Sequence, residues 1–71
     1  MGEKIKNLAI AEFKDSRMEI ELNKPSKIGG LRQIHIQNES FRFDLDEQEF
    51  LKLSTAILVA RRKLLKLKGD L

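Results

Sequence analysis

The spacing of apolar residues changes at Asp46, and this change constrains the fold more than any other feature of the chain. Before Asp46, apolar residues recur at every second position in two short runs, the period of half-buried strands. The first run is Ile34 and Ile36, and the second is Phe41, Phe43 and Leu45. After Asp46 they follow alternate steps of three and four, the period of a helix: Phe50, Leu53, Ile57, Ala60, Leu64 and Leu67. The sequence therefore predicts strands up to Asp46 and one long helix after it.

A hairpin is expected within residues 31–45, with Asn38 and Glu39 as a two-residue loop. Asn tolerates the positive φ that such a turn requires. This register sets Ile36 opposite Phe41 and places the apolar side chains of both strands on one face of the sheet.

The helix has clear signals at both of its ends. Asp46 can cap its start, Glu49 can complete a capping box, and Gly69 suits the left-handed position just past its end. Acidic residues at the start and basic residues at the end match the helix dipole. In this interpretation the cations between Arg61 and Lys68 need no ligand.

A second hairpin is expected upstream, where a two-residue loop sets Phe13 opposite Met18. The segment KPSKIGG, residues 24–30, contains the only proline and a glycine pair, and it interrupts any strand. The upstream hairpin consists of two strands, at residues 8–13 and 17–22, and a loop that contains Asp15 and Ser16.

The predicted order is four antiparallel strands in a meander followed by one long helix, an α+β fold (β-β-β-β-α) in a single domain, residues 1–71. A helix of about 23 residues spans roughly 34 Å, which is longer than a strand of about 7 residues. The helix should therefore overhang its sheet. It also carries a second apolar seam, Leu51, Leu58 and Leu65, about 100° round from the first. The surplus apolar surface predicts a homodimer joined through the helices at this seam, with sheet edges as a further contact.

The composition is unfavourable for catalysis. His35 is the only histidine, Cys and Tyr are missing, and no glycine-rich phosphate loop is present. Glu12 opposite Glu19 could bind a metal, but two exposed carboxylates in water are the simpler interpretation. We expect no enzyme activity, no metal and no cofactor.

The chain also lacks an apolar run of about 18 residues that could span a bilayer, and it lacks a signal-peptide segment at its amino end. With no cysteine for disulfides, this predicts a soluble, cytoplasmic protein. Association with a nucleoid stays open.

The face opposite the buried one is polar, and we expect it to be exposed to solvent. It carries Gln33, His35 and Gln37 beside Arg42, and Leu8 and Ile10 are expected there too. The net charge of +3 and the pI of about 9.5 favour anionic partners. KPSKIGG is either a plain solvated loop or a cationic arm whose Lys24 and Lys27, with Arg32, contact phosphates.

The layout resembles the Pur-alpha repeat and the transcriptional coactivator called positive cofactor four, which are single-stranded nucleic-acid-binding proteins. RMEIELN at 17–23 resembles the second strand of the Pur repeat, and GGLRQIHI at 29–36 resembles its third strand. SFRFDLDEQEFLKL at 40–53 resembles the last strand, turn and helix start of both families. The resemblance implies a homodimer that binds single-stranded DNA or RNA with little sequence specificity, in transcription or nucleic-acid metabolism, with a protein partner in transcription.

Under this hypothesis the sheet face and its connections contact nucleic acid. Phosphates would be met by Lys14, Arg17, Lys24, Lys27, Arg32 and Arg42, and bases would lie across Gln33, His35 and Gln37. The alternative is a dimeric protein-interaction module of the same fold, which the acidic residues Glu19, Glu21 and Asp44 on that face favour.

Overall fold

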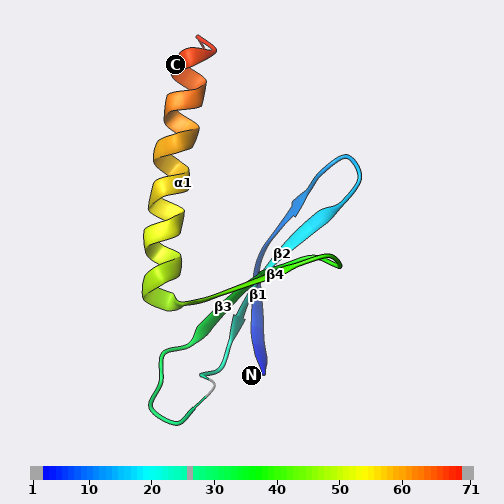
Figure 1. Ribbon diagram of the computed structural model, residues 1–71, viewed down its shortest axis with the longest axis vertical. Helices are drawn as coiled ribbons and strands as arrows, with labels where there is room; N and C mark the ends of the chain where they lie inside the picture. Colours follow the sequence, from blue (N-terminus) through cyan, green and yellow to red (C-terminus); the bar gives the residue numbers. More distant parts are fainter. Residues whose placement is uncertain (1–2, 26, 70–71) are drawn as a thin grey trace.

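The computed structural model describes residues 3–25 and 27–69, which form one sheet and one helix (Figure 1). The elements are β1 (Lys4–Glu12), β2 (Arg17–Asn23), β3 (Gln33–Gln37), β4 (Arg42–Asp46) and α1 (Glu47–Leu67). The strands lie in the order β1-β2-β3-β4, each antiparallel to its neighbour. The predicted four-stranded meander and C-terminal helix are confirmed.

Both hairpins are shifted by two residues from their predicted registers. Ile36 lies opposite Phe43 rather than Phe41, and Met18 lies opposite Ala11 rather than Phe13. A shift of two residues leaves each paired side chain on the face predicted for it, because side chains alternate between faces with a period of two.

The shift in the second hairpin follows from the position of Asn38 in its turn. Asn38 lies before the loop, where its N–H donates to the Phe41 carbonyl at 3.0 Å. Its side-chain oxygen accepts hydrogen bonds from the backbone N–H groups of Ser40 at 2.7 Å and of Phe41 at 3.0 Å. This Asx-type turn needs no left-handed residue. Among the described residues only glycines have a positive φ.

Strand β1 is longer than predicted and contains two irregularities. Its pairing with β2 shifts between Lys4 and Lys6 and again between Asn7 and Ala9. A bulge changes the face that the following side chains occupy. Leu8 consequently lines a depression on the helix side of the sheet, so its predicted place on the polar face is wrong.

The junction between β4 and α1 contains no loop. Asp46 ends β4 and caps α1: its side chain accepts a hydrogen bond from the Glu49 N–H at 2.8 Å, and its own N–H donates to the Glu49 side chain at 3.1 Å. Arg32 forms an ion pair with Glu47, whose N–H donates to the Arg32 carbonyl at 3.2 Å. At the other end, Gly69 has a φ of 79° and donates to the Lys66 carbonyl, as its predicted role requires.

The apolar core of the single chain is small. Ile34 and Ile36 are the buried apolar residues of the described part, at 3% and 9% exposure, and α1 has no buried residue. Most of α1 is therefore not covered by its own sheet, in agreement with the predicted overhang. In Figure 1, α1 rises from the end of β4 while the β1–β2 hairpin diverges from it.

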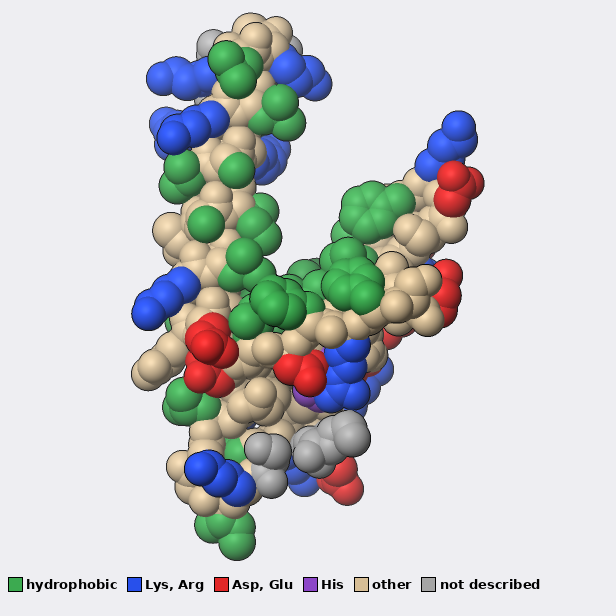
Figure 2. Space-filling model, viewed as in Figure 1, with side chains coloured by type: hydrophobic (Ala, Val, Ile, Leu, Met, Phe, Trp, Pro, Cys, Tyr) green, Lys and Arg blue, Asp and Glu red, His purple; other side chains and the backbone are tan. Residues whose placement is uncertain are grey.

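The molecule is correspondingly extended, with dimensions of 48 × 27 × 17 Å. Its radius of gyration is 14.5 Å, whereas a compact domain of this length has about 11 Å. We call the space between α1 and the β1–β2 hairpin the apolar V. Its walls include Leu8, Phe13, Phe43, Phe50 and Leu51, and Figure 2 shows hydrophobic side chains on both sides of it.

Candidate nucleic-acid interface

The sheet surface that faces away from the apolar V carries polar side chains in register across three strands. We call it the polar face. Its central row is Glu21 on β2, His35 on β3 and Asp44 on β4. The flanking rows are Glu19, Gln37 and Arg42 on one side, and Asn23, Gln33 and Asp46 on the other.

His35 is buried, at 5% exposure, so the prediction of a solvent-exposed histidine is wrong. It lies in the central strand between Glu21 and Asp44, and the Arg42 side chain reaches back to it. The Arg42 Nη2 lies 2.8 Å from the His35 Nε2, and that Nε2 lies 3.7 Å from the Asp44 Oδ1. Since an arginine can only donate, the Nε2 accepts this hydrogen bond. His35 therefore holds Arg42 in place and is not available to stack on a base.

The two glutamines and Arg42 are more accessible than His35. Gln33 and Gln37 are half-buried, and Arg42 is exposed. The Gln33 amide donates to the Leu31 carbonyl at 3.3 Å. These three residues keep polar groups at the surface on either side of the buried histidine.

The sequence did not indicate that two further polar residues, Glu21 and Asn23, would be buried. Glu21 is 8% exposed and Asn23 is 3% exposed. Lys4 reaches Glu21 at 3.7 Å, and the Asn23 amide lies 3.5 Å from the Glu21 carbonyl. Strand β1 was predicted to begin at residue 8, so Lys4 was not expected to cover this part of the sheet.

The predicted phosphate contacts form two groups at opposite ends of β2. Arg17 begins β2 and Arg42 pairs near it, with Lys14 in the adjoining turn. Lys24 follows the other end of β2, and a strand of about seven residues separates it from Arg17 by roughly 23 Å. Lys27 and Arg32 lie with Lys24 in the β2–β3 connection. The polar face thus has cations at both ends and hydrogen-bonding side chains between them.

Four of these six cations, and also Lys4 of β1, have an acidic partner. The pairs are Lys4 with Glu21 at 3.7 Å, Arg17 with Glu19 at 3.1 Å, Lys24 with Glu3 at 3.3 Å, Arg42 with Asp44 at 2.7 Å, and Arg32 with Glu47. Exposed pairs of this kind contribute little to stability, about 0–1 kcal/mol each, and can be exchanged for a different anion.

Arg17 and Gln37 also line a shallow depression of about 220 Å³ at the β2–β3 end of the polar face. Glu19, Asn38 and Glu39 complete its lining. The depression therefore has one cation, two carboxylates and two amides. It offers hydrogen bonds in several directions but no positive net charge.

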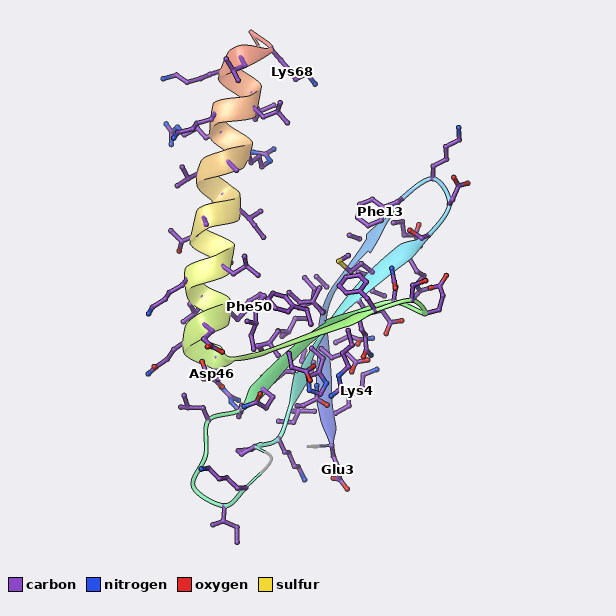
Figure 3. All side chains as sticks on the ribbon, viewed as in Figure 1. Glu3, Lys4, Phe13, Asp46, Phe50 and Lys68 are labelled. Atoms are coloured by element: carbon purple, nitrogen blue, oxygen red, sulfur yellow. The ribbon has the colours of Figure 1, made fainter. Side chains whose placement is uncertain are left out.

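The predicted dimer residues lie along α1 and are accessible in the single chain. Leu51 and Leu58 are 63% and 65% exposed, and Leu65 is half-buried. Leu51 also lines a depression of about 260 Å³ in the apolar V, with Leu8, Leu22, Ile34 and Phe50 among its other lining residues. Figure 3 shows Phe13 on the hairpin and Phe50 on α1 on opposite sides of the apolar V.

The carboxylate pair that could have bound a metal does not form, because Glu12 lies opposite Arg17 and Glu19 lies opposite Ile10. Within residues 3–25 and 27–69, no group of three or more acidic, histidine or cysteine side chains is arranged to hold a metal ion. The same residues include no helix with the length and apolar character needed to cross a bilayer.

Comparison with protein-family models, curated protein sequences and solved structures finds no match to this chain.

Proposed function

We propose that the protein is a homodimer that binds single-stranded nucleic acid across the polar face of its sheet. The observation that carries the proposal is the difference in polarity between the two faces of the sheet. One face is apolar and largely uncovered, while the other has hydrogen-bonding groups between two groups of cations about 23 Å apart.

The exposed area supports the dimer. The chain exposes 5824 Å², whereas a folded monomer of 8.2 kDa exposes about 4500 Å². The excess of about 1300 Å² is more than the roughly 800 Å² that each partner buries in a standard protein interface. A second copy in the apolar V would remove this excess, because the exposed aromatic side chains Phe13 and Phe43 line it.

The polar face supports single-stranded nucleic acid as the ligand. Gln33 and Gln37 can each donate and accept hydrogen bonds, and the cations at both ends can contact successive phosphates. Affinity would come mainly from the phosphates and would fall with salt, with a log-log slope near −0.7 for each phosphate neutralised. The paired rows of this face carry no Phe, Tyr or Trp side chain, so base stacking would contribute little to the affinity.

A second candidate function is a dimeric protein-interaction module. The observation that favours it is the pairing of five Lys and Arg side chains of the sheet and its connections with carboxylates, which leaves little net charge on the polar face. A protein partner could use such a face through hydrogen bonds and exchanged ion pairs.

The two candidates differ in their response to salt and to charge removal. We would measure binding of a fluorescein-labelled oligothymidine by fluorescence anisotropy for the wild type and for Lys24→Gln/Lys27→Gln. The matched control is Lys6→Gln/Lys52→Gln, which removes the same charge away from the polar face. For Lys24→Gln/Lys27→Gln, the log-log salt slope should be smaller in magnitude by about 1.4, as expected for two lost phosphate contacts on a single strand. No wild-type binding at about 50 mM salt would instead favour the protein-interaction module.

A further inference from the structure

The positive charge of α1 is distributed very unevenly along its length. Its acidic residues are Glu47 and Glu49, both in the first turn. From Phe50 onward it has only basic charged residues, and most of them lie in the last two turns: Lys52, Arg61, Arg62, Lys63 and Lys66, with Lys68 as the C-cap. Figure 2 shows Lys and Arg side chains gathered around the end of the helix.

Three cations near the end of α1 differ from the sheet cations in their ion pairing within the described part of the chain. Arg62, Lys63 and Lys66 form no ion pair with any residue of the described part of the chain. The nearest carboxylate along the helix, Glu49, precedes Arg62 by 13 positions, or about 20 Å of helix. We call Arg62, Lys63 and Lys66 the basic end of α1.

The helix dipole accounts for only part of this cluster. The dipole acts on charges within the last turn, and Lys66 is the basic residue of that turn. Arg62 and Lys63 lie more than one turn before Leu67 and gain little from it. Arg62 and Lys66 are also four positions apart, and Lys63 and Lys66 three, so their like charges repel on the helix surface. This arrangement is unfavourable in the free protein and becomes favourable when an anion binds.

The basic end would stay accessible in the proposed dimer. With 3.6 residues per turn, Lys63 and Lys66 lie on the side of α1 away from both apolar seams, whereas Arg62 borders the second seam beside Leu58 and Leu65. The stripe faces the apolar V at its start, where Phe50 lines the depression beside β3. Packing either seam against a second copy therefore leaves Lys63 and Lys66 pointing to solvent.

We infer that the basic end of α1 is a second nucleic-acid contact, which binds the phosphate backbone separately from the polar face. The inference rests on the proposed function and extends it to another surface. Residues 61–68 contain no aromatic, Asn or Gln side chain that could read a base, so this contact is independent of sequence. Lys and Arg without acidic partners are the groups that neutralise phosphates and release counterions.

A nucleic acid fits the basic end better than an anionic membrane does. A helix that lies in a membrane interface buries its apolar stripe in lipid and commonly carries aromatic anchors. The stripe of α1 begins over its own sheet, and the chain has no Trp or Tyr. The basic end therefore lacks aromatic anchors, and the apolar residues that share a depression with Arg62, Leu58 and Leu65, belong to the seam that the proposed dimer would cover.

The test compares three double variants that each remove two positive charges. They are Lys63→Gln/Lys66→Gln at the basic end, Lys24→Gln/Lys27→Gln at the polar face, and the control Lys6→Gln/Lys52→Gln. Binding of labelled oligothymidine would be followed by anisotropy from about 50 to 200 mM salt. Circular dichroism and sedimentation would check the fold and the oligomeric state. We expect the basic-end variant to bind about tenfold more weakly, with a salt slope lower by about 1.4, and the control to change little.

The possible failures are distinguishable. If the wild type binds the strand and the basic-end variant binds as tightly with an unchanged slope, this inference is overturned and the proposed function stands. If the basic-end variant alone loses binding, the basic end is the nucleic-acid contact and the proposed site on the polar face is overturned. If the wild type does not bind the oligothymidine, both this inference and the proposed function fail. Binding to vesicles of phosphatidylserine and phosphatidylcholine that is lost in the basic-end variant and is not competed by oligothymidine would overturn the inference in favour of a membrane.

Discussion

At the scale of single residues, the predicted register made His35 and Arg42 neighbours across the hairpin, but it did not reveal that they form a hydrogen-bonded unit with a buried histidine. The alternation around His35 correctly predicted its face, but the face of a strand does not determine how deeply a side chain is buried. Arg42 is long enough to reach back from β4 and donate to the His35 Nε2, while Asp44 holds the same guanidinium at 2.7 Å. In the observed register Asp44 rather than Arg42 lies directly opposite His35, and Arg42 covers the imidazole from the diagonal position.

This unit makes Arg42→Ala a stability test. The substitution removes the hydrogen bond to a buried imidazole nitrogen, and a buried polar group without its partner costs about 1–3 kcal/mol. We expect the free energy of unfolding to fall by about 1 kcal/mol, measured by urea denaturation at a fixed protein concentration. Arg17→Ala is the matched control, because Arg17 pairs only with the half-exposed Glu19 and should change stability by less than about 0.5 kcal/mol. Equal losses for the two variants would argue against a structural role for the Arg42–His35 contact.

At the scale of elements, the helix and the strand order could be predicted because their signals are local. The period of three and four residues lies within the helix, and the cap at Asp46 and the glycine at position 69 lie within two residues of its ends. The hairpin registers and the bulges in β1 could not be predicted as well. They depend on which backbone groups pair across two strands. Asn38 shows how one side-chain acceptor can move the centre of a turn by one position and the register of the hairpin by two.

The Asp46 cap provides a test of the β4–α1 junction. Asp46→Ala removes the acceptor for the Glu49 N–H while leaving the strand pairing in place. Loss of an N-cap typically costs about 1 kcal/mol, and we expect that decrease in the free energy of unfolding. Asp15→Ala, in the turn between β1 and β2, removes the same charge without removing a helix cap and should have little effect on the free energy of unfolding. If both variants unfolded at the same urea concentration as the wild type, the capping box would not contribute to the stability of α1.

At the scale of the whole molecule, the apolar V is the feature that most needs an explanation. The sequence predicted surplus apolar surface from the length of the helix and from its second seam, and the structure places most of it around one open space. The sequence could not predict the angle at which α1 leaves the sheet. That angle is fixed by the absence of a loop after β4 and by the contacts of Arg32 with Glu47.

The proposed dimer predicts a specific response to a charge placed on the second seam. We expect the wild-type chain to sediment at micromolar concentration with twice its mass of 8.2 kDa. Leu58→Asp would bury a carboxylate without a partner in the interface, so this variant should sediment as a monomer or lose its helical circular dichroism. Lys52→Asp is the matched control. It introduces the same side chain on the side of α1 opposite both apolar seams, and it should remain dimeric. A wild-type chain that sediments as a folded monomer, or a Leu58→Asp variant that stays dimeric, would contradict the proposed interface.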